Sequence, residues 1–184
     1  GFSTGDGLSF AATWADYDGD GDLDAAVPIF GITPFPPDEY GPGEGPPGPP
    51  SVLLENRGSA GFVDISALLP ETNDGYPMLM GWHDLDGDRT PELVVVNDHG
   101  IQVRSNRVWA FNGTDFEDIG AELGLEAAID GMGLGVGDLD GDLQPDLLIT
   151  DWGSVSLFES EGGIYADTAL ARGLTPPQGA QVAW

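Results

Sequence analysis

The chain has 184 residues and is strongly acidic, with 32 Asp and Glu residues against five Lys and Arg, which gives a formal net charge of −27. This balance argues against nucleic-acid binding and against docking on anionic lipid, because both need a basic surface. The absence of cysteine excludes disulfide bonds and thiolate chemistry, and no apolar stretch reaches the roughly 20 residues of a membrane span.

The first predicted elements are an apolar stretch at 8–14, read as a strand, and an acidic run of nine residues at 16–24. The run carries acids at places one, three, five and nine and glycine at place four. Carboxylates this close repel one another, and a hard divalent cation relieves the repulsion. Ca²⁺ suits best because it accepts about six to eight oxygens in flexible geometry, whereas Zn²⁺ would recruit His or Cys.

The predicted ligands of this first loop come from five alternate places. The acids at places one, three and five point inward, the backbone carbonyl of place seven fills a gap, and the acid at place nine closes the cage; these residues are Asp16, Asp18, Asp20, Asp22 and Asp24. An EF-hand is excluded, because its loop needs a bidentate Glu at place twelve and Val27 stands there.

A second strand is predicted at 25–30 and a third at 52–55, with an insertion at 33–50 between them. The insertion holds eight of the 15 prolines, so it cannot join a sheet and favours extended segments with glycine joints. It is either a protruding binding loop that presents Phe35 and Tyr40, or a tolerated disordered insertion. A fourth strand is predicted around Phe62 and Asp64.

The same order of elements recurs twice along the chain. The second set has strands at 78–82, 93–96, 108–111 and 116–118, and the third has strands at 132–136, 147–149, 155–158 and 165–167. The corresponding loop ligands are Asp84, Asp86, Asp88, Thr90 and Glu92 in the second run, and Asp138, Asp140, Asp142, Gln144 and Asp146 in the third. We therefore expect about three Ca²⁺ ions, with solvated acidic turns as the plain alternative.

Four short strands per repeat, with the runs 68 and then 54 residues apart, predict an all-β fold of β-propeller blades, each of four antiparallel strands. The expected blades lie at about 7–66, 77–120 and 131–169, within a single segment spanning 1–184. Residues 179–184 repeat a first strand and begin a fourth blade. We therefore expect a partial or open propeller, completed by other blades or by other chains.

The acid runs with their flanking strands resemble the FG-GAP and VCBS repeats of integrin-like propellers. The motifs GFVDI at 61–65 and AELGL at 121–125 are similar to the branch that includes cartilage acidic proteins and bacterial UnbV-like proteins. This resemblance implies calcium-bearing blades in an extracellular protein that serves adhesion or partner binding.

Place six of the acid run departs from the family pattern in two of the three loops. The family has glycine there, as the first loop does at Gly21, but Arg89 and Leu143 occupy it in the others. A left-handed backbone at a residue other than glycine costs on the order of 1 kcal/mol. We therefore expect the second and third loops to bind Ca²⁺ more weakly or to curl differently.

The function expected from these patterns is a non-enzymatic, calcium-binding module with a structural, adhesion or partner-recognition role. We expect an extracellular or secreted location, including the cell surface or periplasm, and a protein or glycan partner on the face that carries the insertion at 33–50. One alternative is a carbohydrate-binding propeller, which needs exposed aromatics at equivalent positions in several blades. Another is an accessory module of a larger secreted enzyme. Trp14, Trp82 and Trp184 recur in phase and are expected to pack between blades.

Overall fold

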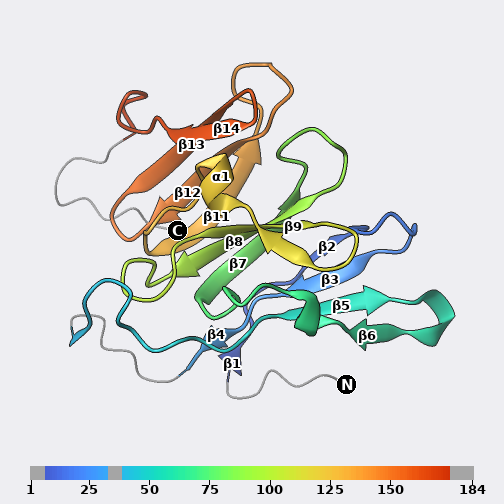
Figure 1. Ribbon diagram of the computed structural model, residues 1–184. Coiled ribbons are helices and arrows are strands. Elements are labelled where there is room, and N and C mark those ends of the chain that lie inside the picture. The colour runs from blue at the N-terminus through green and yellow to red at the C-terminus, as the bar shows by residue number, and fades with distance from the viewer. Residues whose placement is uncertain (1–6, 33–38, 175–184) are drawn as a thin grey trace.

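Three four-stranded antiparallel sheets make up most of the computed structural model, which describes residues 7–32 and 39–174 (Figure 1). Blade 1 contains, in order, β2 (Thr13–Ala15), β3 (Asp24–Val27), β5 (Val52–Asn56) and β6 (Phe62–Asp64). Blade 2 contains β7 (Tyr76–His83), β8 (Glu92–Asp98), β9 (Arg107–Phe111) and β10 (Phe116–Asp118). Blade 3 contains β11 (Gly131–Gly137), β12 (Asp146–Asp151), β13 (Val155–Glu161) and β14 (Ile164–Asp167). The prediction of an all-β fold with four-stranded antiparallel blades is confirmed.

The prediction of one continuous first strand in blade 1 is wrong. The apolar stretch 8–14 divides into β1 (Gly7–Leu8) and β2, and only β2 joins the sheet of blade 1. β1 pairs instead with β4 (Phe30–Gly31), which follows the second strand of the blade. The pairing partner therefore decides where the strand breaks, and the apolar pattern alone does not.

Helical segments are few and short among the described residues. They include the 3₁₀ turns η2 (Gly58–Ala60) and η3 (Ser66–Leu68) and the α-helical turn α1 (Gly120–Leu123). Within residues 7–32 and 39–174, none of them has the length and apolarity needed to cross a bilayer. The predicted beginning of a fourth blade at 179–184, including Trp184, lies outside the described residues.

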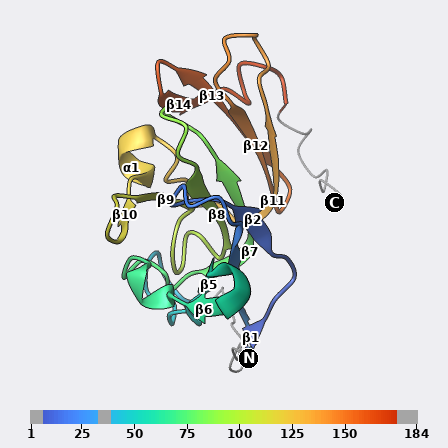
Figure 2. The ribbon, with the colours of Figure 1, turned by 90° about the vertical axis from the view of Figure 1, so that its right-hand side faces the viewer.

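The second strand of blade 2 divides its side chains between two cores. Every residue of β8 is buried, and the continuous apolar segment 93–96 at its centre predicts this burial. Leu93 and Val95 enter the core against blade 1, while Val94 and Val96 enter the core against blade 3. Blade 2 therefore lies between the other two blades, as Figure 2 shows.

The core between blades 1 and 2 is rich in aromatic side chains. Tyr17 stacks on Trp82 with ring centroids 5.9 Å apart, and Trp109 and Phe116 are buried in the same cluster. The predicted blade-packing role of Trp82 is confirmed, because its side chain is 8% exposed and lies in this core. Trp14 occupies the same place relative to its acid run but is 54% exposed, on the face of blade 1 turned away from blade 2.

Glycine in the first strand of blade 3 permits a close approach at one position. A Cβ atom on Gly131 would lie 2.5 Å from Cγ1 of Val96 in β8. Farther along β11, a Cβ on Gly137 would meet no atom within 4 Å. Along β11, the close approach to blade 2 that requires glycine therefore lies at the beginning of the strand.

The described part of the insertion, residues 39–50, is tied to blade 2. Gly43 donates to the carbonyl of Ile101 at 3.0 Å, and Gly45 donates to that of Gln102 at 2.8 Å. In Figure 1 this segment lies on the opposite side of the sheets from the three acidic loops. The segment is therefore anchored along its described length, while Phe35 lies outside the described residues.

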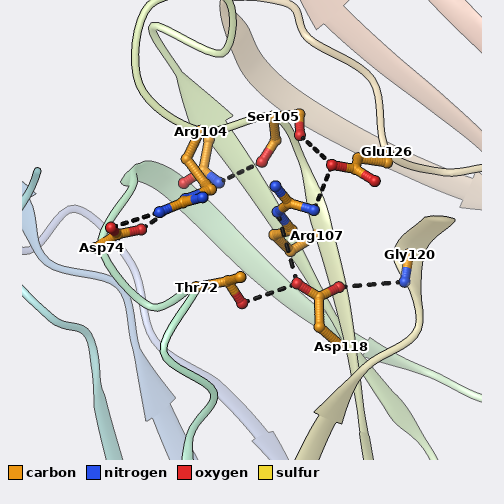
Figure 3. A network of polar contacts seen from close by, with 9 residues as sticks. Thr72, Asp74, Arg104, Ser105, Arg107, Asp118, Gly120 and Glu126 are labelled. Carbon is orange, nitrogen blue, oxygen red and sulfur yellow. Dashed lines mark hydrogen bonds and ion pairs between the residues drawn. The ribbon is translucent and has the colours of Figure 1, made fainter. Parts of the chain in front are cut away.

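A polar network fastens the connection between blades 1 and 2 to the outer part of blade 2 (Figure 3). Arg104 makes a two-pronged ion pair with Asp74, with nitrogen to oxygen distances of 2.7 and 2.6 Å. Thr72 donates to Asp118 at 2.8 Å, and Arg107 lies between Asp118 and Glu126. These contacts occupy two of the five arginines.

Candidate metal-binding loops

Each acidic run forms the loop between the first and second strands of its blade. The three loops connect β2 to β3, β7 to β8 and β11 to β12, and they lie along the same side of the molecule (Figure 1). The acid at place nine is the first residue of the second strand in every case, and it is buried; these residues are Asp24, Glu92 and Asp146. The strand pairing therefore fixes this carboxylate beneath the loop.

The loops share one pattern of hydrogen bonds between side chains and backbone. The carboxylate at place three accepts from the amide of place five, and the carboxylate at place five accepts from the amide of place seven. Asp18, Asp86 and Asp140 make the first bond at 3.0 to 3.1 Å, and Asp20, Asp88 and Asp142 make the second at 2.6 to 2.8 Å. Short acidic side chains favour such local turns, so the spacing itself specifies the curl.

Place six adopts a left-handed backbone in all three loops. Its φ is 94° at Gly21, 78° at Arg89 and 70° at Leu143. In each loop its amide donates to the acid at place one at 3.1 Å. The expectation that the second and third loops curl differently is therefore wrong, because this hydrogen bond holds Arg89 and Leu143 in the strained conformation. Weaker binding by those loops stays a prediction.

Place two has a role that the sequence reading missed. In the second and third loops the acid at place nine accepts its amide, from Leu85 to Glu92 at 2.7 Å and from Leu139 to Asp146 at 2.8 Å. The side chain at place two then leaves the loop: Tyr17 enters the core between blades 1 and 2, and Leu85 enters the core between blades 2 and 3. The available signal was a large apolar or aromatic residue at place two in every run.

The predicted ligands are only partly gathered by the structure. In each loop the acids at places one, three and nine offer oxygens that lie within 4.8 Å of one another: Asp16, Asp18 and Asp24; Asp84, Asp86 and Glu92; Asp138, Asp140 and Asp146. The acids at place five, Asp20, Asp88 and Asp142, are outside these groups and hold the amide of place seven instead. Coordination by the carbonyls of Asp22, Thr90 and Gln144 stays a prediction.

The electrostatics of the loops fit a cation. Oδ1 of Asp16 and Oδ2 of Asp24 are buried and accept no hydrogen bond. The pKa of Glu92 is raised to about 7, chiefly by burial; the Leu85 amide lowers it, and the neighbouring acids Asp86, Asp88 and Asp84 contribute to the rise. Burial also raises the pKa of Asp18 and Asp24. A divalent ion would supply the positive charge that these carboxylates lack.

Comparison with protein-family models matches residues 84–149 to the FG-GAP-like repeat, a little over a third of the chain. The matched segment begins at the first acid of the second loop, passes through the rest of blade 2 and the third loop, and ends in β12. The search of curated proteins gave no significant match. Modules of this kind are typically non-catalytic. The hydrogen-bonded acidic loops at both ends of the segment agree with this match, and residues 84–149 are an FG-GAP-like repeat.

Proposed function

We propose that this chain is a calcium-binding β-propeller module of an extracellular protein, with a structural role and a role in partner recognition. The observation that carries the proposal is the threefold repetition of one arrangement. In each blade the carboxylates of places one, three and nine converge within 4.8 Å, and the first loop leaves two buried carboxylate oxygens without a donor. Repetition in every blade favours a structural ion over a single catalytic one.

Calcium bound in these loops would reinforce packing between blades. The acid at place nine would bind the ion while it holds the amide of place two, as Glu92 holds that of Leu85. The side chain of Leu85 is fully buried against blade 3. Since metal binding to a folded site contributes to folding free energy, the ion would stabilise the loop and the neighbouring interface together.

The proposed partner surface lies at the other end of the blades, where residues 39–50 rest on blade 2. The proposed partner is a protein or glycan. Further blades, from this chain or from another, would cover the outer face of blade 1, where Trp14 and Phe62 are 54% and 51% exposed. We favour an extracellular location because weak calcium sites fill there at millimolar concentrations.

The carbohydrate-binding alternative loses support from the position of the aromatics. Trp14 is exposed, but its counterpart Trp82 is buried, and Val136 stands at the same place in blade 3. A row of equivalent exposed aromatics is therefore lacking among these three blades. A non-catalytic accessory role within a larger secreted enzyme remains compatible with the same calcium chemistry.

Thermal unfolding with calcium and with EDTA tests the proposal. At a free Ca²⁺ concentration ten times the Kd, each site should add about 1.4 kcal/mol to the free energy of unfolding. The melting temperature should therefore rise with calcium, and calorimetric titration should give about three ions per chain. An identical melting temperature in EDTA and in millimolar Ca²⁺ would exclude calcium as a structural ion.

A variant pair assigns the sites to the loops. Asp16→Asn should remove one ion from the titration, because Asp16 holds both the loop amide at place six and the proposed ion. Asp115→Asn removes the same charge from the exposed turn between β9 and β10 and should keep the full stoichiometry. Equal loss in both variants would mean that calcium only screens the net negative charge.

A further inference from the structure

A second kind of cluster lies at the end of blades 2 and 3 opposite the acidic loops. Asp98 is the last residue of β8, His99 follows it, and Asp130 immediately precedes β11. Each offers one donor atom, and the three atoms lie within 4.8 Å of one another. The three residues line a pocket of about 290 Å³ together with Met132 and Trp152.

The backbone holds this cluster together across the two blades. The amide of Gly100 donates to the carbonyl of Ile129 at 3.1 Å, and a Cβ on Gly100 would lie 2.2 Å from that oxygen. The amide of Asp130 donates to Oδ1 of Asp151 at 3.2 Å. His99 has a left-handed backbone with φ of 55°, and its ring packs edge-on against Tyr76 with centroids 5.5 Å apart. These contacts place the three donors before any ligand arrives.

The cluster carries buried negative charge that no arginine balances. Asp98 is 8% exposed, and its Oδ2 lies 3.6 Å from Nε2 of His99. Oδ1 of Asp130 is buried and accepts no hydrogen bond. Burial raises the pKa of both Asp98 and Asp130, and the nearby Asp151 raises them further, while His99 lowers them. A cation bound here would supply the missing charge.

The basic residues of the chain are engaged or placed elsewhere. The sequence has no lysine. Four arginines form ion pairs with other acids, namely Arg57 with Glu55, Arg104 with Asp74, Arg107 with Glu126 and Arg172 with Glu159. The fifth, Arg89, lies in the acidic loop of blade 2 at the opposite end of the sheet. Within the described residues, His99 is therefore the only basic side chain that faces the two carboxylates.

We propose that Asp98, His99 and Asp130 form a binding site for a borderline divalent metal ion of the Zn²⁺ type, distinct from the acidic loops. The loops offer only oxygen donors, which suit Ca²⁺, whereas an imidazole beside two carboxylates suits Zn²⁺. Asp151 is a positioning residue, because its carboxylate holds the backbone of Asp130. Three protein donors leave a coordination position for water or for an acidic group of a ligand in the pocket.

The test is a zinc titration of the full chain kept in excess Ca²⁺, so that the loops are saturated. The wild type should bind one Zn²⁺ per chain. His99→Asn and Asp130→Asn should weaken binding by more than the roughly 10- to 100-fold that loss of an outer-shell partner costs, and Asp151→Asn should fall within that range. Asn is chosen at position 99 because it tolerates a left-handed backbone.

The second histidine of the chain provides the matched control. His83 lies at the end of β7, beside the second acidic loop. The variant His83→Gln should keep zinc affinity within about twofold of the wild type, because only loss of a ligand or of its support weakens a metal site strongly. In ¹⁵N-labelled wild-type protein, zinc should shift the imidazole signals of His99 and leave those of His83 in place. This spectral readout needs no variant, so it stands even if His99→Asn fails to fold.

Three outcomes would overturn the proposal. They are the lack of stoichiometric zinc binding in the presence of Ca²⁺, equal affinity in the wild type and both ligand variants, and a shift of His83 in place of His99. Each is independent of whether EDTA changes the melting temperature. Failure of the zinc site would therefore leave the proposed calcium function untouched, and the reverse also holds.

Discussion

The acidic loops of blades 2 and 3 have the same spacing and the same hydrogen bonds, yet their second residues end in opposite environments. Leu85 is fully buried in the core between blades 2 and 3, while Leu139, at the same place in the third loop, is 62% exposed. Both amides donate to the acid at place nine, at 2.7 and 2.8 Å. The loops therefore differ in their surroundings and not in their internal structure.

This difference separates what is local from what is tertiary. The curl of the loop comes from acids that accept amides two to five residues away, so it forms wherever the spacing occurs. The value of the apolar residue at place two depends on a neighbouring blade. A leucine at place two should thus contribute several kcal/mol to the free energy of unfolding in the second loop and little in the third.

Leu85→Ala should give the largest effect. Truncating a buried leucine typically costs 2 to 5 kcal/mol, because transfer free energy is lost and a cavity remains. The matched variant Leu139→Ala should change the free energy of unfolding by less than about 0.5 kcal/mol. Urea denaturation of both variants in saturating Ca²⁺ measures the difference.

A cost for Leu139→Ala close to that for Leu85→Ala would mean that another blade or chain covers the third loop in solution. Dilution of the sample should reduce the cost if a separate chain supplies the cover, because that cover depends on protein concentration.

The titration of Glu92 should give the next largest effect, which is a pH dependence of the stability of the calcium-free protein. Its pKa is raised from about 4.5 to about 7 in the folded state. A carboxyl group whose pKa is higher in the folded state than in the unfolded state stabilises the fold at pH values below its unfolded-state pKa. This stabilisation is lost as the pH rises through its folded-state pKa. The free energy of unfolding should therefore fall by about 3 kcal/mol between roughly pH 4.5 and 7 on account of this one group.

Glu92→Gln isolates that contribution because glutamine does not titrate. In EDTA the variant should lose the part of the pH slope due to Glu92 and be more stable than the wild type at pH 7. In saturating Ca²⁺ the order should reverse, because a ligand is missing. Glu122→Gln, on an exposed position of α1, should follow the wild-type slope. Parallel pH profiles for all three proteins would contradict the burial of Glu92.

Much of the fold could be predicted from the sequence because the acid runs mark the same position in each repeat. Their spacing located the first and second strands of blades 2 and 3, and the continuous apolar segment at 93–96 predicted the doubly buried strand β8. The carboxylates at places one, three, five and nine were predicted to converge, and those at places one, three and nine lie within 4.8 Å of one another. These features depend on short-range geometry, which the sequence carries directly.

Features that depend on contacts between distant segments were missed. The sequence did not show that β1 leaves blade 1 to pair with β4, or that residues 39–50 lie on blade 2. It also did not unite Asp98 and His99 with Asp130, because the link runs through the backbone contact of Gly100 with Ile129. Similarly, the left-handed backbone of Leu143 is enforced by a hydrogen bond to Asp138, which residue preference alone does not predict.

Substitutions at place six should give the smallest effect, and they allow the first loop to be compared with the third. Gly21 and Leu143 have φ of 94° and 70°, and a Cβ on Gly21 would meet no atom within 4 Å. Gly21→Ala should therefore cost about 1 kcal/mol through backbone strain alone. Leu143→Gly should gain less than about 1 kcal/mol, because relief of strain is partly offset by the greater chain entropy of glycine when unfolded. Chemical denaturation in EDTA and in Ca²⁺ measures both, with Gly137→Ala as the control.

Gly137 also has open space around its Cβ position, but its backbone is not left-handed. Gly137→Ala should therefore be neutral or slightly stabilising, as expected where alanine fits without strain. A cost at Gly21 equal to that at Gly137 would show that the first loop relaxes its backbone when glycine is replaced. The curl would then be set by the bound ion and not by the hydrogen bond from place six to place one. If the cost appears in EDTA as well as in Ca²⁺, the acid spacing alone holds the loop in the conformation that receives the metal.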